Sequence, residues 1–179
     1  METDWEFEIG GDAPVIAPYW RGFVDLRAHP ERAAEISECR ELPGLANALV
    51  RLNAANSPVW TSKTDVFIPE QVDADEMDAS VHEVAYAIAC YIDLLQRTDR
   101  PWNDPAQAEQ ACRELCAGLR QKQLECCRID IVVRKAAEAD NNKLGATVYL
   151  TACGPTFIEA KDRLGKCLDV FAEAAVVSR

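Results

Sequence analysis

The sequence predicts an α+β fold, in which an antiparallel sheet carries its helices on one face and leaves the other face open. Two observations predict this fold. Segments with apolar side chains at helical spacing alternate along the chain with segments rich in branched and aromatic residues. In addition, a pattern with one Asp inside an apolar or branched stretch occurs four times, at residues 23–26, 63–66, 91–94 and 128–131.

Composition supports a globular chain and excludes some partners. The chain has 179 residues, 49% of them hydrophobic, and a formal net charge of −11. This length and apolar content predict a single α+β domain over residues 1–179. Nucleic acid and anionic membranes both attract surfaces rich in Lys and Arg, so a strongly acidic chain is a poor partner for either. We therefore expect no nucleic-acid and no membrane partner.

The first third of the chain predicts three strands and two helical segments. Residues 4–9 alternate acids with large apolar side chains, which is typical of a strand with one wet face. Residues 19–27 and 59–68 are rich in aromatic and branched side chains and predict two further strands. Residues 33–39 predict one or two helical turns. Leucines at positions 45, 49 and 52 then predict a helix that ends near Asn53.

The last third predicts a helix, a hairpin and a final helix. Asp104 as the cap and Pro105 at the first helical position predict a helix to about Gln121. Residues 128–136 and 144–153 predict two strands joined by a polar turn. Residues 158–175 predict the last helix, with Ile158, Leu164, Leu168, Phe171 and Ala175 on its buried side.

Residues 80–96 fit both a helix and a strand template. Ser80 and Glu83 form the pattern of a capping box, which favours a helix. Residues 85–95 also alternate and contain one of the four Asp patterns, and we favour a strand there. The order of elements is then βαββαβ, followed by one more strand and helix, which predicts a ferredoxin-like sheet. The two strand–strand–helix passages, 59–121 and 128–175, are also consistent with an internal duplication.

Alternation along the strands predicts which side chains share each face. The buried face would carry Val24, Leu26, Val66, Ile68, Ile92, Leu94, Ile129, Ile131 and Val133. The open face would carry a mixture of acids, cations and aromatic rings. Its candidate binding residues are Asp25, Arg27, Lys63, Asp65, Tyr91, Asp93, Asp130 and Arg134.

Three functions fit such a face. The first is a non-catalytic cytoplasmic interaction domain that forms a homo-oligomer, because acids and cations can pair reciprocally across a two-fold axis. The second is an enzyme in which Asp65, Asp93 and Asp130 hold a metal or act on a small polar ligand. The third is an acidic protein that neutralises a basic protein partner, using an acidic patch around residues 70–83. No known catalytic or cofactor motif occurs, and we expect no cofactor.

The cysteines and tryptophans favour structural roles. The first residues are acidic rather than basic and apolar, which predicts no export signal and reduced thiols in the cytoplasm. The spacing of Cys112 and Cys116 from Cys126 and Cys127 does not suit a zinc site, because neighbouring strand residues point to opposite faces. Buried thiols are the expected role of all these cysteines. Trp20 and Trp60 could each either wall a pocket or lie in the core.

Overall fold

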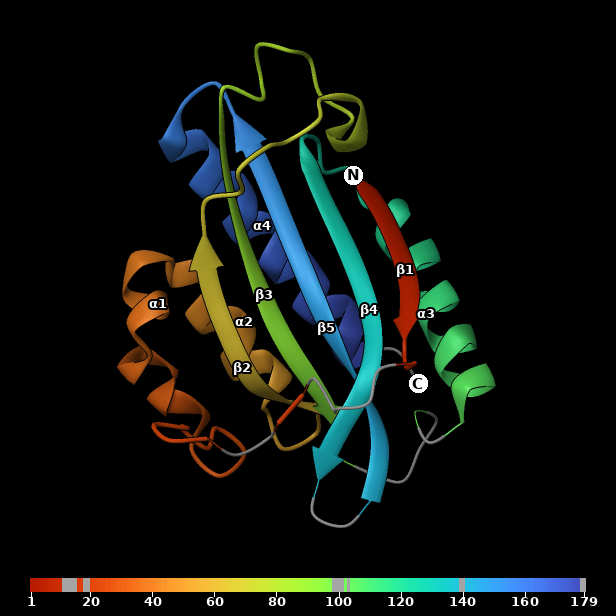
Figure 1. Cartoon of the computed structure of the whole chain (residues 1–179). Coiled ribbons are helices and arrows are strands. Elements are labelled where there is room, and N and C mark those ends of the chain that lie inside the picture. Colours follow the sequence, from red (N-terminus) through yellow and green to blue (C-terminus); the bar gives the residue numbers. More distant parts are fainter. Residues whose placement is uncertain (11–15, 18–19, 98–101, 103, 139–140, 178–179) are drawn as a thin grey trace.

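Five strands form one mixed sheet in the computed structural model of the chain (Figure 1). The structure describes residues 1–10, 16–17, 20–97, 102, 104–138 and 141–177. The strands lie in the order β1-β4-β5-β3-β2. Their bounds are Glu2–Glu8 for β1, Val59–Phe67 for β2, Tyr86–Gln96 for β3, Cys127–Glu138 for β4 and Asn141–Gly154 for β5.

The two hairpins β2–β3 and β4–β5 meet in the middle of the sheet, where β3 pairs antiparallel with β5. The first strand behaves differently. It pairs parallel with β4 at the edge of the sheet, with Glu2 beside Arg128 and Glu8 beside Arg134. The prediction of an all-antiparallel sheet is therefore wrong in this respect, and the ferredoxin-like arrangement is not confirmed. The α+β class itself is confirmed.

Helices α2 and α4 lie behind the sheet in the view of Figure 1, with α1 beside the β2 edge and α3 beside the β1 edge. Helices α4 and α2 pack against each other, α4 lies against β5, and α3 flanks β1. No helix in the described part of the chain is long and apolar enough to cross a membrane. The bounds are Ser37–Glu41 for α1, Pro43–Leu52 for α2, Pro105–Arg120 for α3 and Phe157–Val177 for α4, with short 3-10 helices at Pro30–Glu35 (η1) and Asp75–Met77 (η2).

The main core lies between these helices and one face of the sheet. Alternate residues of β3, β4 and β5 meet Leu164, Leu168 and Phe171 of α4 there, as their spacing predicts. The predicted cap also forms, because the Asp104 side chain accepts a hydrogen bond from the Ala106 N–H. Two predicted core residues, Ile68 and Ile158, are instead exposed because each lies at or beyond the end of its element.

The strand predicted for residues 19–27 is wrong: its first residue lies outside the described part, and residues 20–27 form turns. Gly22 has φ +95°, a left-handed conformation that favours glycine, and the Phe23 N–H donates to the Trp20 carbonyl. The Asp25 carboxylate accepts the Arg27 N–H, which closes a second local turn. Local hydrogen bonds therefore replace a strand ladder here, although Leu26 is buried as predicted.

The ambiguous segment 80–96 is resolved in favour of the strand, β3. Ser80 and Glu83 do bond to each other, because the Ser80 N–H and hydroxyl both donate to the Glu83 carboxylate at 3.1 and 2.9 Å. No helix follows this pair. β3 lies between β5 and β2, so its backbone groups on both sides are taken up by strand pairing.

Candidate functional site

The face of the sheet opposite the helices is covered at both ends by connecting segments, and its middle carries the half-buried side chains of Asp130, Tyr149 and Tyr91. At one end, Ile16 pairs with Ala136 and packs against Trp60 and Leu95. This is the lower cover, formed by residues 16–17 and 20–23; its Phe23 also packs against this cluster. Trp60 is buried beneath it, so Trp60 has the core role rather than the pocket role.

The other end is covered by residues 70–84, which we call the upper cover. Met77 from this segment packs against Cys126 and Cys153, and Figure 1 shows the loop passing in front of the sheet. Arg163 of α4 holds the cover by pairing with Glu83 at 3.2 Å. The pKa of Glu83 is lowered to about 2, first by the Ser80 N–H and then by the Ser80 hydroxyl, Cys126 and Arg163. The acidic patch predicted around residues 70–83 is therefore partly paired.

Between the two covers lies the central band, where side chains line up in rows across the strands. One row runs from Asp130 through Tyr149 and Tyr91 to Asp65, across β4, β5, β3 and β2. The two tyrosine rings contact each other with centroids 6.0 Å apart. The next row contains Val132, Thr147 and Asp93.

Asp93 is the buried acid of the central band, with 7% of its surface exposed. Its Oδ1 accepts a hydrogen bond of 2.6 Å from the Thr147 hydroxyl. Burial raises the pKa of Asp93, because a charged carboxylate loses its water there, while Thr147, Lys63 and Arg134 act in the opposite direction. The Asp93 carboxylate therefore has a hydrogen-bond donor in Thr147 and lies on the face of the sheet opposite the helices.

Cations surround the tyrosine pair. Arg134 donates to the Tyr149 hydroxyl at 3.0 Å and to the Glu8 carboxylate at 2.8 Å. The Lys63 ammonium lies 5.8 Å from the centroid of the Tyr91 ring, and Tyr91 is the first cause of the raised pKa of Lys63. Arg128, further along β4, donates from Nε to both carboxylate oxygens of Asp130.

Six of the eight predicted binding residues lie in the central band, as their strand positions predict: Lys63, Asp65, Tyr91, Asp93, Asp130 and Arg134. Asp25 and Arg27 do not, because residues 20–27 form turns rather than a strand. They bind each other, with Arg27 Nη2 2.6 Å from Asp25 Oδ2. The Arg27 guanidinium also lies 4.3 Å from the centre of the Trp60 ring.

The structure does not bring Asp65, Asp93 and Asp130 together. Asp65 and Asp130 lie in one row with two strands between them, which separates their backbones by about 14 Å at ordinary strand spacing. One ion cannot bind both carboxylates at that separation. Within the described part of the chain, no group of three or more His, Cys, Asp or Glu residues is placed to hold a metal ion.

Sequence reasoning missed the acids of β1. Thr3, Trp5 and Phe7 point toward the helices, so the alternate side chains point to the open face beside β4. The alternation of acids and apolar residues was visible in the sequence, but its position next to β4 depends on a parallel pairing between distant segments. These acids form one edge of the central band: Glu2, Asp4, Glu6 and Glu8.

The eight cysteines are free and buried. Cys127 lies in the main core and Cys126 under the upper cover, on opposite sides of the sheet as predicted. Burial raises the pKa of Cys126 to about 12 and also raises the pKa of Cys153. Because the thiolate is the reactive form, neither environment is suited to a nucleophile.

Some charged groups of the central band are paired with neighbours, as Asp130 is with Arg128 and Arg134 is with Glu8, and its carboxylates are spread over separate strands. Comparison with known proteins finds no matching family model, no matching curated protein and no matching solved structure. The function has to be inferred from the geometry of the central band itself.

Proposed function

We propose that this protein is a non-catalytic interaction protein of the cytoplasm that binds a second copy of itself through the central band. The observation that carries the proposal is the distribution of charge across the band. The acids of β1 lie at one edge of the sheet, and β2 at the other edge carries Lys63 together with Asp65. Glu6 at one edge and Lys63 at the other are opposite in charge, so these two positions are complementary across a two-fold axis.

The strand order specifies which residues would meet. β5 is the central strand of the five, so a two-fold axis along it places β1 of one copy over β2 of the other. Glu6 lies in the same row as Val132, Thr147 and Asp93, and Lys63 follows next on β2. In the dimer, Glu6 of each copy would therefore face Lys63 of the other.

The middle of the band can be covered without leaving a buried charge alone. Asp93 is bonded to Thr147, Arg134 to Glu8, and Asp130 to Arg128 within one chain. Burial of an isolated charge is costly, whereas a paired charge loses much less on association. The rings of Tyr91 and Tyr149 and the 38%-exposed Phe67 provide apolar surface for the contact.

A charge swap tests the proposal, with solution mass measured by light scattering over a range of protein and salt concentrations. We expect a dimer for the native chain, and weaker association for both Lys63→Glu and Glu6→Lys because each places like charges opposite each other. The two changes combined in one chain should restore the dimer. Added salt should weaken association, since these pairs lie at the rim.

A matched control is Glu114→Lys, which makes the same charge change as Glu6→Lys on an exposed position of α3, away from the sheet face. It should leave the mass unchanged. A monomeric native chain at all concentrations would overturn the proposal, as would a dimer that tolerates both single changes. A monomer that forms a complex with a basic protein such as lysozyme, but loses that complex in Glu6→Lys, would favour the basic-partner function instead.

A further inference from the structure

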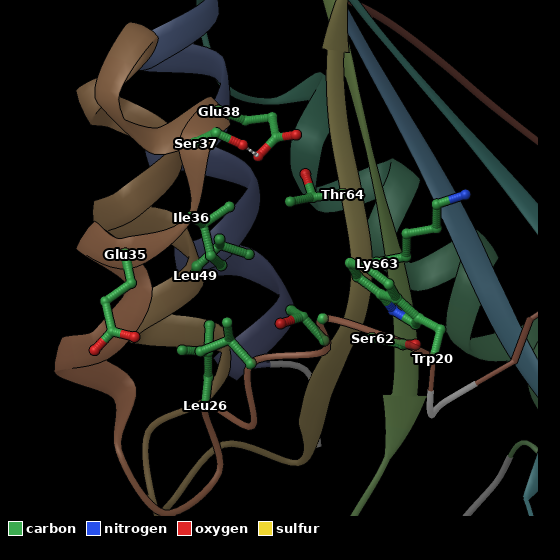
Figure 2. Close-up of a pocket in the computed structure, with 13 residues that line it drawn as sticks. Trp20, Leu26, Glu35, Ile36, Ser37, Glu38, Leu49, Ser62, Lys63 and Thr64 are labelled. Carbon is green, nitrogen blue, oxygen red and sulfur yellow. Dashed lines mark hydrogen bonds between the residues drawn. The ribbon is translucent and has the colours of Figure 1, made fainter.

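A cavity of about 340 Å³ lies outside the central band, between β2 and the segment that contains η1 and α1. Its volume is within the range of small-molecule sites. Figure 2 shows Leu26, Ile36 and Leu49 on one side of this space and Thr64 of β2 on the other. Trp20 also lines the cavity, with 47% of its surface exposed. The sequence allows Trp20 either to wall a pocket or to lie in the core, and the structure places it at a pocket wall.

The cavity lies at an irregularity in β2. Thr61 pairs with Leu94 and Thr64 pairs with Ile92. Two residues of β2 therefore lie between these pairs where β3 has only one, so β2 carries one extra residue there. Such bulges bend a strand and redirect its side chains. In Figure 2 the Lys63 ammonium points past β2, away from the cavity. Its positive charge is therefore directed to the central band.

Glu38 is the acid that faces the space. In Figure 2 its carboxylate lies on the side nearest Thr64, whereas the Glu35 carboxylate points outward. Arg32 binds Glu35 through two hydrogen bonds of 2.9 and 2.8 Å. Glu38 accepts a hydrogen bond of 2.8 Å from Ser37 and has no cationic partner among the residues that the structure describes.

The hydroxyl groups on the walls are already used as donors. Thr64 donates to the Tyr91 carbonyl at 2.8 Å, Ser62 to the Ala17 carbonyl at 3.0 Å, and Ser37 to Glu38. Each of these hydroxyl oxygens can therefore only accept a hydrogen bond from a ligand. Together with the Glu38 carboxylate, they favour a ligand that carries N–H donors and a positive charge.

We infer that this cavity binds a small organic cation, a primary amine attached to an apolar body. The ammonium group binds Glu38, and the apolar body packs against Leu26, Ile36 and Leu49. This site borders the central band at Lys63, which lines the cavity, and the inference does not depend on self-association.

Phenethylamine is the first probe, compared with phenethyl alcohol and phenylacetate, which have a similar apolar body but no positive charge. Binding is followed by the NMR signals of the Trp20 indole and the Ile36 and Leu49 methyl groups. We expect the amine to bind at millimolar concentration or below, as is usual for a ligand of this size, and the other two compounds to bind more weakly.

Glu38→Gln keeps the shape of the side chain and removes its charge, and it should weaken amine binding by about tenfold or more. Glu35→Gln is the matched control, because it removes a neighbouring charge that points away from the cavity, and it should leave binding unchanged. Thermal unfolding of both variants verifies that they fold. Equal binding of the alcohol, an equal effect of both variants, or no response of the cavity signals to the amine would each overturn the assignment.

Discussion

The two faces of the sheet are built from the same strands but have opposite chemistry. On β4, Ile129, Ile131 and Val133 are fully buried under the helices, while the alternate positions Arg128, Asp130 and Arg134 point the other way. Burial of apolar surface stabilises the fold, whereas paired charges at a surface add little. A one-residue step along the strand therefore separates a position that maintains the fold from a position available for recognition.

The largest expected difference between the faces comes from two phenylalanines. Phe171 of α4 has no exposed surface, and Phe67 of β2 is 38% exposed. Phe171→Ala should lower the free energy of unfolding by about 3–5 kcal/mol, because it removes a large side chain from a packed core. Phe67→Ala should cost much less. Urea denaturation of the two variants measures both values, and similar losses would contradict the assignment of the two faces.

A smaller and pH-dependent effect is expected at Asp93, the buried acid of the open face. Its folded pKa is raised above 3.8, so the folded state holds the proton more tightly than the unfolded chain does. As the pH rises from about 3.8 through the folded pKa, the native chain therefore loses stability at this position. Asp93→Asn cannot ionise, and its stability relative to the native chain should increase over the same pH interval.

Urea denaturation at several pH values measures this difference, and parallel pH profiles for the native chain and Asp93→Asn would rule the prediction out. Thr147→Val provides a second variant, in which the pH dependence of stability should become stronger rather than weaker. The Thr147 hydroxyl lowers the pKa of Asp93, so its removal should raise that pKa further and steepen the loss of stability with rising pH.

The smallest effect is expected at the upper cover and should stay local. The pKa of Glu83 is about 2 in the folded chain and 4.5 in the reference state, so its contribution is present above pH 4.5 and is lost as the pH falls toward 2. The cover should therefore loosen over this interval, as seen in the NMR signal of the Met77 methyl group. Glu83→Gln should show a loosened cover already at neutral pH and little further change on acidification.

Glu76→Gln is a suitable control because Glu76 lies in the same segment and pairs with Arg128 rather than Arg163. An acid transition of the Met77 signal that persists in Glu83→Gln would show that another group controls the cover. If acidification instead unfolded the whole chain in one step, the upper cover would belong to the same cooperative unit as the core.

Short-range features of the fold could be predicted from the sequence. The helix at Pro105–Arg120, the hairpin β4–β5 and the helix α4 all form close to their expected positions. Their signals are local: a capping Asp, an alternating pattern and a helical apolar spacing. The strand predicted at residues 19–27 fails for the same reason, because Gly22 and Asp25 are turn residues whose local hydrogen bonds outweigh a favourable strand composition.

Long-range features could not be predicted in this way. No local pattern specifies that β1 pairs parallel with β4, so the acids of β1 were not assigned to the open face. The rows of the central band could be predicted in part from the sequence. Once β3 is recognised as a strand, alternation places Asp93 and Tyr91 on one face. The two covers and the cavity beside Trp20 depend on how connecting segments fold back over the sheet, and side-chain alternation contains no information about that.

The pairing of β1 has a consequence for the order in which the chain can assemble. β1 leaves the ribosome before β4, and Glu8 binds Arg134, a residue 126 positions later. During synthesis β1 therefore has no pairing partner until β4 has been made. Its four acids would serve it in that interval, because like charges on an unpaired strand oppose pairing with the same strand of a neighbouring nascent chain.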